Sequence, residues 1–354
     1  MKPTKSSISI LPLASSSGDA NDQKTDRSVN YRIRIVVLLF LCLQNSGHAL
    51  VARYSQKTLN ERYSTTEVVL VSELIKLVIS TFAALYEKND SEPVNMRKLG
   101  YLITHSEKMI VLVFLYSINN ILSYVALGKV DAALYTVLSQ LKILTTAGFM
   151  KFFFERSLSS AKWRALLLLV LGCVLVASPV YHLSDKIKTG QLTQAESSDA
   201  YVVNSVIGII VVLVMVTNSG FASVYLESVL KKEKLSVWDR NFQLSFLSVL
   251  LVLGIILSER LNTDTLYTPL FQGFTLNAYL LALIQALGGI LVAAALKYAD
   301  SILKTLATCL AIVVTAVLEC VFMNTPMDIF VIIGCVATIL AIANYSFDVT
   351  PDSS

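Results

Sequence analysis

Residues 301–323 read SILKTLATCLAIVVTAVLECVFM, a largely apolar run with only two charged side chains, Lys304 and Glu319. At a rise of about 1.5 Å per residue, a helix of this length crosses a hydrocarbon core about 30 Å thick. Lipid offers no partner to free backbone N–H and C=O groups, so the run is expected to be helical. It therefore predicts a membrane-spanning helix that carries charge into the bilayer.

Further apolar runs of similar length follow one another along the chain. They cover residues 35–53, 65–86, 109–128, 132–153, 162–181, 203–228, 241–258, 276–297 and 328–347. The composition agrees, because 55% of the residues are hydrophobic, 15% are charged and the mean hydropathy is +0.64. We predict an all-α membrane protein with ten transmembrane helices over 35–348, a disordered tail over 1–34 and a short tail over 349–354.

Lysine and arginine are concentrated in alternate loops, which predicts the orientation. The loops after the second, fourth and sixth spans, and the N-terminal tail, hold most of them. Cytoplasmic loops retain positive residues, so both termini are expected on the cytosolic side. The net charge of +4 is too small to indicate nucleic acid as a partner, and the expected partner is the lipid bilayer.

The longest polar stretch between spans, 182–200, divides the ten helices into halves at 35–181 and 201–348. Because each half has an odd number of spans, the second half is expected to be inverted relative to the first. Leu141-Lys142-x-Leu144-x-Thr146 in the fourth span recurs as Leu303-Lys304-x-Leu306-x-Thr308 in the ninth. Inverted repeats place a substrate at their interface near the bilayer midplane.

Lys142 and Lys304 place ammonium groups inside the membrane, at a cost of about 2.5–3.5 kcal/mol each on insertion scales. Both are expected in the same half of the bilayer, and no acidic residue is evidently placed to neutralise both. A phosphate is the natural counter-charge. The alternative is a fixed buried ion pair between Lys142 and Glu73 or Glu319.

Other polar residues fall inside spans. Asn119, Tyr135, Ser219 and Asn241 are candidates for recognition of a base or a ribose, or form hydrogen bonds between helices. Glu73 and Lys76, at i and i+3, either contact a ligand or pair with each other. No catalytic motif, metal-ligand spacing or cysteine pair is present, so no catalytic residue, metal or cofactor is expected.

Several segments resemble one family. They are Asn119-Asn120-Ile-Leu-Ser-Tyr, Asp131-Ala-Ala-Leu-Tyr135, Gln140-Leu-Lys142, Ser219-Gly220-Phe-Ala-Ser-Val-Tyr225-Leu-Glu227, Trp238-Asp-Arg240-Asn241-Phe-Gln243, Gly288-Gly289-Ile-Leu-Val-Ala and Lys297-Tyr298-Ala-Asp300-Ser-Ile-Leu-Lys304. They run in the same order as in nucleotide-sugar transporters of the UDP-galactose, UDP-N-acetylglucosamine and CMP-sialic acid branch. The resemblance implies a drug/metabolite transporter fold and exchange of a nucleotide-sugar for the nucleoside monophosphate.

The resemblance also implies a site and a location. Nucleotide-contacting positions of the family fall on Asn119, Tyr135, Lys142, Ser219, Asn241 and Lys304, and its sugar-end positions fall on Glu73 and Lys76. The Golgi membrane is the implied location, with the endoplasmic reticulum as the alternative. A homo-oligomer and a complex with Golgi glycosyltransferases are both open.

The substrate branch is predicted from details of these segments. The Gln285-Ala-Leu-Gly288-Gly289 and Leu144-Thr145-Thr146 runs look more like UDP-sugar members, whereas Tyr135 is closer to the CMP-sialic acid pattern. UDP-galactose or UDP-N-acetylglucosamine is the favoured substrate, and CMP-sialic acid is the alternative. The alternatives from other functional classes are a polytopic glycosyltransferase-like enzyme and a scaffold that does not transport.

Overall fold

The computed structural model describes residues 17–55, 59, 61, 63–87, 96–130, 132–155, 158–177, 198–233, 235–262, 269–323 and 328–347. Asp131, most of the polar loop at 182–200, residues 1–16 of the tail expected at 1–34, and the tail at 349–354 lie outside these ranges. Residues 17–34 are described and are helical. Regular secondary structure in the described residues is entirely helical. The helices are α1 (Ser17–Arg53), α2 (Thr65–Tyr86), α3 (Met96–Thr104), α4 (Glu107–Leu127), α5 (Ala132–Ser139), α6 (Lys142–Phe154), α7 (Ser160–Ala177), α9 (Ser198–Lys232), α10 (Val237–Asn262), α11 (Leu276–Tyr298), α12 (Ser301–Met323) and α13 (Ile329–Ser346).

Within these ranges, eight helices are long and apolar enough to cross a membrane: α1, α2, α4, α9, α10, α11, α12 and α13. The protein is therefore a multi-pass membrane protein. The fifth expected span corresponds to α7, and the fourth is divided between α5 and α6. The prediction of one continuous helix over 132–153 is thus wrong.

The break between α5 and α6 has a local cause. The Ser139 hydroxyl donates to the Thr136 carbonyl at 2.8 Å, and that carbonyl would accept from the Gln140 amide in a regular α-helix. The Gln140 amide bonds to Val137 instead, and the Leu141 amide bonds to Leu138. These i→i+3 bonds form a tighter turn of the 3₁₀ type, and Lys142 begins the helix that follows it.

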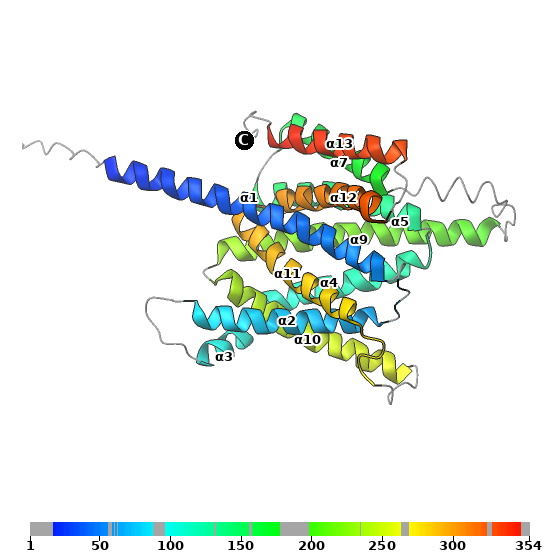
Figure 1. The fold of residues 1–354 in the computed structure, drawn as a ribbon, viewed down its shortest axis with the longest axis horizontal. Coiled ribbons are helices and arrows are strands. Elements are labelled where there is room, and N and C mark those ends of the chain that lie inside the picture. Colours follow the sequence, from blue (N-terminus) through cyan, green and yellow to red (C-terminus); the bar gives the residue numbers. More distant parts are fainter. Residues whose placement is uncertain are drawn as a thin grey trace, which may run out of the picture.

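The two halves of the chain interleave rather than sit apart (Figure 1). α1 packs on α11 and α12, and α9 packs in the same way on α4 and α6. α2 packs on α10 at one edge of the bundle, and α7 packs on α13 at the other. This pattern is unchanged when α1 is exchanged with α9, α2 with α10, α4 with α11, α6 with α12 and α7 with α13.

Glycines allow the closest contacts at the α7–α13 edge. A methyl group on Gly172 would lie 2.5 Å from the Thr338 hydroxyl oxygen, and one on Gly334 would lie 2.8 Å from the Val176 amide. Gly172 therefore lies against the residue four positions after Gly334, and Gly334 lies against the residue four positions after Gly172. Small residues of this kind let membrane helices approach closely where lipid supplies no hydrophobic drive.

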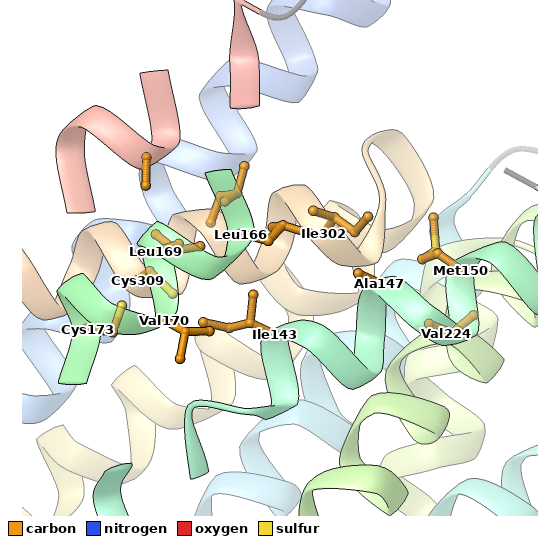
Figure 2. Packing of buried hydrophobic residues seen from close by; sticks show 12 residues of the cluster. Ile143, Ala147, Met150, Leu166, Leu169, Val170, Cys173, Val224, Ile302 and Cys309 are labelled. Atoms are coloured by element: carbon orange, nitrogen blue, oxygen red, sulfur yellow. The ribbon is translucent and has the colours of Figure 1, made fainter. Parts of the chain in front are cut away.

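The largest buried cluster joins α6, α7 and α12 (Figure 2). It is formed by Ile143, Ala147 and Met150 of α6, Leu166, Leu169, Val170 and Cys173 of α7, and Ile302, Leu306 and Cys309 of α12, with Val224 and Ala341 added from α9 and α13. The cluster fixes α6 against α12. Because Lys142 precedes Ile143 and Lys304 follows Ile302 closely, it also fixes where the two lysines lie.

Candidate functional site

The two intramembrane lysines lie within electrostatic range of each other. The Lys304 ammonium donates to the Ser223 hydroxyl at 2.7 Å. Lys142 is exposed, and its ammonium makes no hydrogen bond or ion pair with the described residues. If the expected fourth span crosses the membrane, an ammonium exposed there requires an aqueous environment and not lipid.

The alternative of a fixed ion pair for Lys142 is wrong. Glu73 pairs with Lys76 at 2.7 Å, and Glu319 pairs with Arg53 near the ends of α12 and α1. Each carboxylate has therefore found a different basic partner, because Lys76 is one turn away on the same helix and Arg53 is at the end of an adjacent one. The suggestion that Glu73 and Lys76 pair with each other is confirmed.

Sequence reasoning missed Glu227, an acidic residue of α9 that contacts the start of α12. Its side chain is 1% exposed, and its charge acts on Lys304. One carboxylate oxygen accepts from the Ser301 amide at 2.7 Å, and the other accepts from Lys231 at 2.7 Å. Glu227 thus caps the start of α12 and partly balances the charge at Lys304. Its spacing of four from Lys231 was the available signal.

A second polar region lies between α2, α4, α9, α10 and α11. It surrounds a cavity of about 200 Å³ lined by Glu73, Lys76, Tyr116, Leu226, Leu230, Arg240, Asn241, Leu244, Ser248, Gly289, Val292 and Ala293. Lys76 reaches this place because Gly289 has no side chain; a methyl group there would lie 3.1 Å from the Lys76 Cδ. The neighbouring Gly288 likewise makes room for Gln44 of α1. The two glycines therefore admit polar side chains from two helices.

A network of charged groups adjoins this cavity where α3 ends and where α4 and α10 begin. Arg240 pairs with Glu233, and Glu233 also pairs with Lys108 of α4. Arg240 donates from Nη1 to Gln243 at 2.7 Å, and Gln243 donates to the Leu102 carbonyl at 2.7 Å. The network joins α3 and α4 of the first half to α10 and the end of α9 in the second.

The remaining predicted residues lie on α4, α5, α9 and α10. The Tyr135 hydroxyl is 2.8 Å from the Ser123 hydroxyl and also faces the Met215 sulfur. Oδ1 of Asn119 is buried without a hydrogen-bond partner among the described residues, and so is Oδ1 of Asn241. Ser219 precedes Gly220, which packs directly on Thr145 of α6. Among the eight predicted residues, the structure thus brings Glu73, Lys76 and Asn241 together in one cavity, and Lys142 near Lys304.

Comparison with known proteins decides the family. A family model described as nucleotide-sugar transporter matches residues 29–346. The chain belongs to the nucleotide-sugar transporter family. It is therefore a transporter and not an enzyme.

Named relatives cover nearly the whole transporter. The UDP-N-acetylglucosamine transporter of Homo sapiens is 33% identical over 334 residues, which cover 90% of this chain and 97% of the relative. The UDP-N-acetylglucosamine/UDP-N-acetylgalactosamine transporter nstp-4 of Caenorhabditis elegans is 33% identical over 94% of this chain and 98% of its own. The UDP-galactose transporter of Schizosaccharomyces pombe is 33% identical over 89% and 88%.

One solved crystal structure has the same fold at low sequence identity. It superposes with a TM-score of 0.58 at 13% identity, over 89% of this chain and 98% of that one. At this identity the likeness shows the fold alone.

Proposed function

We propose that this transporter carries a UDP-sugar, UDP-N-acetylglucosamine or UDP-galactose, into the Golgi lumen in exchange for UMP. The observation that carries the proposal is the pair Lys142 and Lys304, one without a partner among the described residues and the other bonded only to a hydroxyl. Two ammonium groups of this kind match the diphosphate of the substrate and the phosphate of the product. Relatives with UDP-sugar names support the choice of base.

Exchange follows from the same electrostatics. If the transporter reorients without a ligand, the two lysine charges stay uncompensated in the membrane interior. A bound phosphate neutralises these charges. We assign Tyr135, Asn119 and Ser219 to the nucleoside, since they lie on α4, α5 and α9. We assign Glu73 and Lys76 to the sugar end, as the resemblance implies, and move Asn241 there from the nucleotide, because the three residues share the cavity between α2 and α10.

We also propose ten spans arranged as two inverted five-helix repeats, with both termini in the cytosol. In support, Gly172 and Gly334, which make reciprocal contacts, are 162 positions apart in the sequence, and so are Lys142 and Lys304. The fourth span, α5 with α6, then corresponds to the ninth, α12. Such repeats rock against each other around a central site to give alternating access.

The test is exchange into proteoliposomes that contain the purified transporter. We expect rapid uptake of labelled UDP-N-acetylglucosamine or UDP-galactose when UMP is inside, slow uptake when the lumen is empty, and little uptake of CMP-sialic acid. Equal uptake with and without internal nucleotide would contradict exchange. Uptake of CMP-sialic acid against CMP, without uptake of UDP-sugars, would move the substrate to the other branch.

A further inference from the structure

Arg240 holds a buried donor that the fold does not use. The residue is 3% exposed and lines the cavity between α2, α4, α9, α10 and α11. Its Nη1 donates to Gln243, and its Nη2 pairs with Glu233. Its Nε has no hydrogen-bond partner among the described residues. A buried N–H of a charged group without a partner is strongly unfavourable, so an acceptor from a ligand is expected there.

The residue beside it offers the opposite chemistry. Asn241 is 1% exposed and lines the same cavity, and its Nδ2 donates a hydrogen bond to the Val237 carbonyl at 3.0 Å. Its Oδ1 is buried and has no partner in the described part of the chain. One donor and one acceptor therefore stand unused on adjacent residues of α10.

This combination indicates the class of ligand. A phosphate accepts hydrogen bonds and would be repelled by the Asn241 oxygen and by the Glu73 carboxylate in the same cavity. A sugar has hydroxyl groups that both donate and accept. The volume of about 200 Å³ is below the roughly 300–1,000 Å³ of pockets that enclose whole drug-sized ligands, so only one end of a nucleotide-sugar fits.

We propose that Arg240 contacts the sugar portion of the substrate, donating from Nε to a sugar hydroxyl or to the carbonyl of an N-acetyl group. The inference rests on the proposed function and extends it to a residue outside the predicted set. Glu233 and Gln243 hold the other end of the guanidinium, so Nε meets the sugar in a fixed direction. Arg240 thereby contributes to selection among sugars.

Substitution Arg240→Lys tests the proposal, because lysine keeps the charge facing Glu233 but has no N–H at the Nε position. We measure apparent affinities for UDP-N-acetylglucosamine, UDP-galactose and UMP by competition in proteoliposome exchange. We expect the affinity for at least one UDP-sugar to fall about tenfold or more, and that for UMP, which lacks the transported hexose, to change less than about twofold. The control Lys151→Met removes an exposed charge on α6, outside this network, and should keep the UDP-sugar to UMP ratio within about twofold of wild type.

Each result decides the question. If Arg240→Lys lowers both affinities equally, or neither, Arg240 does not contact the sugar. If this variant is no longer stabilised against heat by UMP, the double variant Glu233→Gln/Arg240→Gln replaces it, because removal of both charges leaves neither buried alone. An unchanged ratio in that variant would overturn the proposal. Failure of wild type to exchange any UDP-sugar for UMP would instead contradict the proposed function.

Discussion

The lysines of the two polar regions have different partners. In the cavity between α2 and α10, Lys76 is 5% exposed and is balanced by Glu73 at 2.7 Å. Between α6 and α12, Lys142 has no carboxylate partner among the described residues, and Lys304 has a hydroxyl and only the nearby charge of Glu227. In the first region each basic side chain faces a carboxylate before a ligand enters, whereas Lys142 and Lys304 in the second have no ion pair among the described residues.

This difference indicates where each end of the substrate binds. A region whose basic side chains are already ion-paired, and which has unused donors and acceptors, suits an uncharged sugar. A positive region suits phosphates, because a ligand charge replaces the missing counter-ion. An unpaired ammonium in a membrane costs about 2.5–3.5 kcal/mol, so its presence calls for a compensating anion. Changes of charge in the two regions should therefore have opposite consequences.

The largest effect is expected from Lys142→Met. Removal of this ammonium should reduce exchange of UMP for UDP-sugar to the background of empty liposomes and abolish heat stabilisation by UMP. The unfolding temperature without ligand should stay the same or rise, because no ion pair is lost. Lys151→Met is the matched control: Lys151 is exposed and lies on the same helix, and its removal should leave exchange intact. Full exchange by Lys142→Met would remove the basis of the proposed function.

The opposite behaviour is expected from Glu73→Gln. This substitution leaves Lys76 buried without its counter-charge and should destabilise the protein by about 3–5 kcal/mol. Addition of Lys76→Met should restore most of that stability, since neither charge then remains. Unfolding in mild detergent, followed by loss of tryptophan fluorescence or by a thiol-reactive dye, measures both variants. Equal stability of the single and double variants would show that the pair is not isolated from solvent.

A smaller effect, of opposite sign to that of Lys142→Met, is expected from Glu227→Gln. The amide can still accept from the Ser301 amide, but the negative charge near Lys304 is lost. UMP should then bind about threefold to tenfold more tightly, because less of the lysine charge is balanced by the protein. Tighter binding should slow release and lower the maximal rate of exchange. Weaker UMP binding by this variant would mean that Glu227 acts through the shape of the α12 start.

The positions of the membrane helices could be predicted because hydrophobicity is a local property of the chain. The run at 301–323 coincides with α12, Ser301–Met323, and 65–86 coincides with α2, Thr65–Tyr86. Pairing of Glu73 with Lys76 was also foreseeable, since residues three apart on a helix are neighbours. In these cases the sequence separation alone defines the geometry.

Partners that are distant in the chain could not be predicted in this way. Glu319 pairs with Arg53 and Glu233 pairs with Lys108 because the two halves interleave, and nothing in a single span indicates which helix will lie beside it. The unused Nε of Arg240 is still less visible, because it depends on where the other nitrogens of the same guanidinium are held. The roles of the eight predicted site residues remain predictions for transport measurements.

The smallest effect concerns the break that separates the lysine region from Tyr135. In Ser139→Ala the hydroxyl no longer competes for the Thr136 carbonyl, so α5 and α6 should join more regularly and stability should rise by about 0.5–1 kcal/mol. A 3₁₀ turn advances about 20° more per residue than an α-helix, so straightening should rotate Lys142 relative to Tyr135 and reduce the rate of exchange severalfold. Thr217→Ala is the control, because Thr217 donates to the Leu213 carbonyl at 2.8 Å within the unbroken helix α9. If both variants exchange like wild type, the turn does not position Lys142, and the α6–α12 packing alone determines where its ammonium lies.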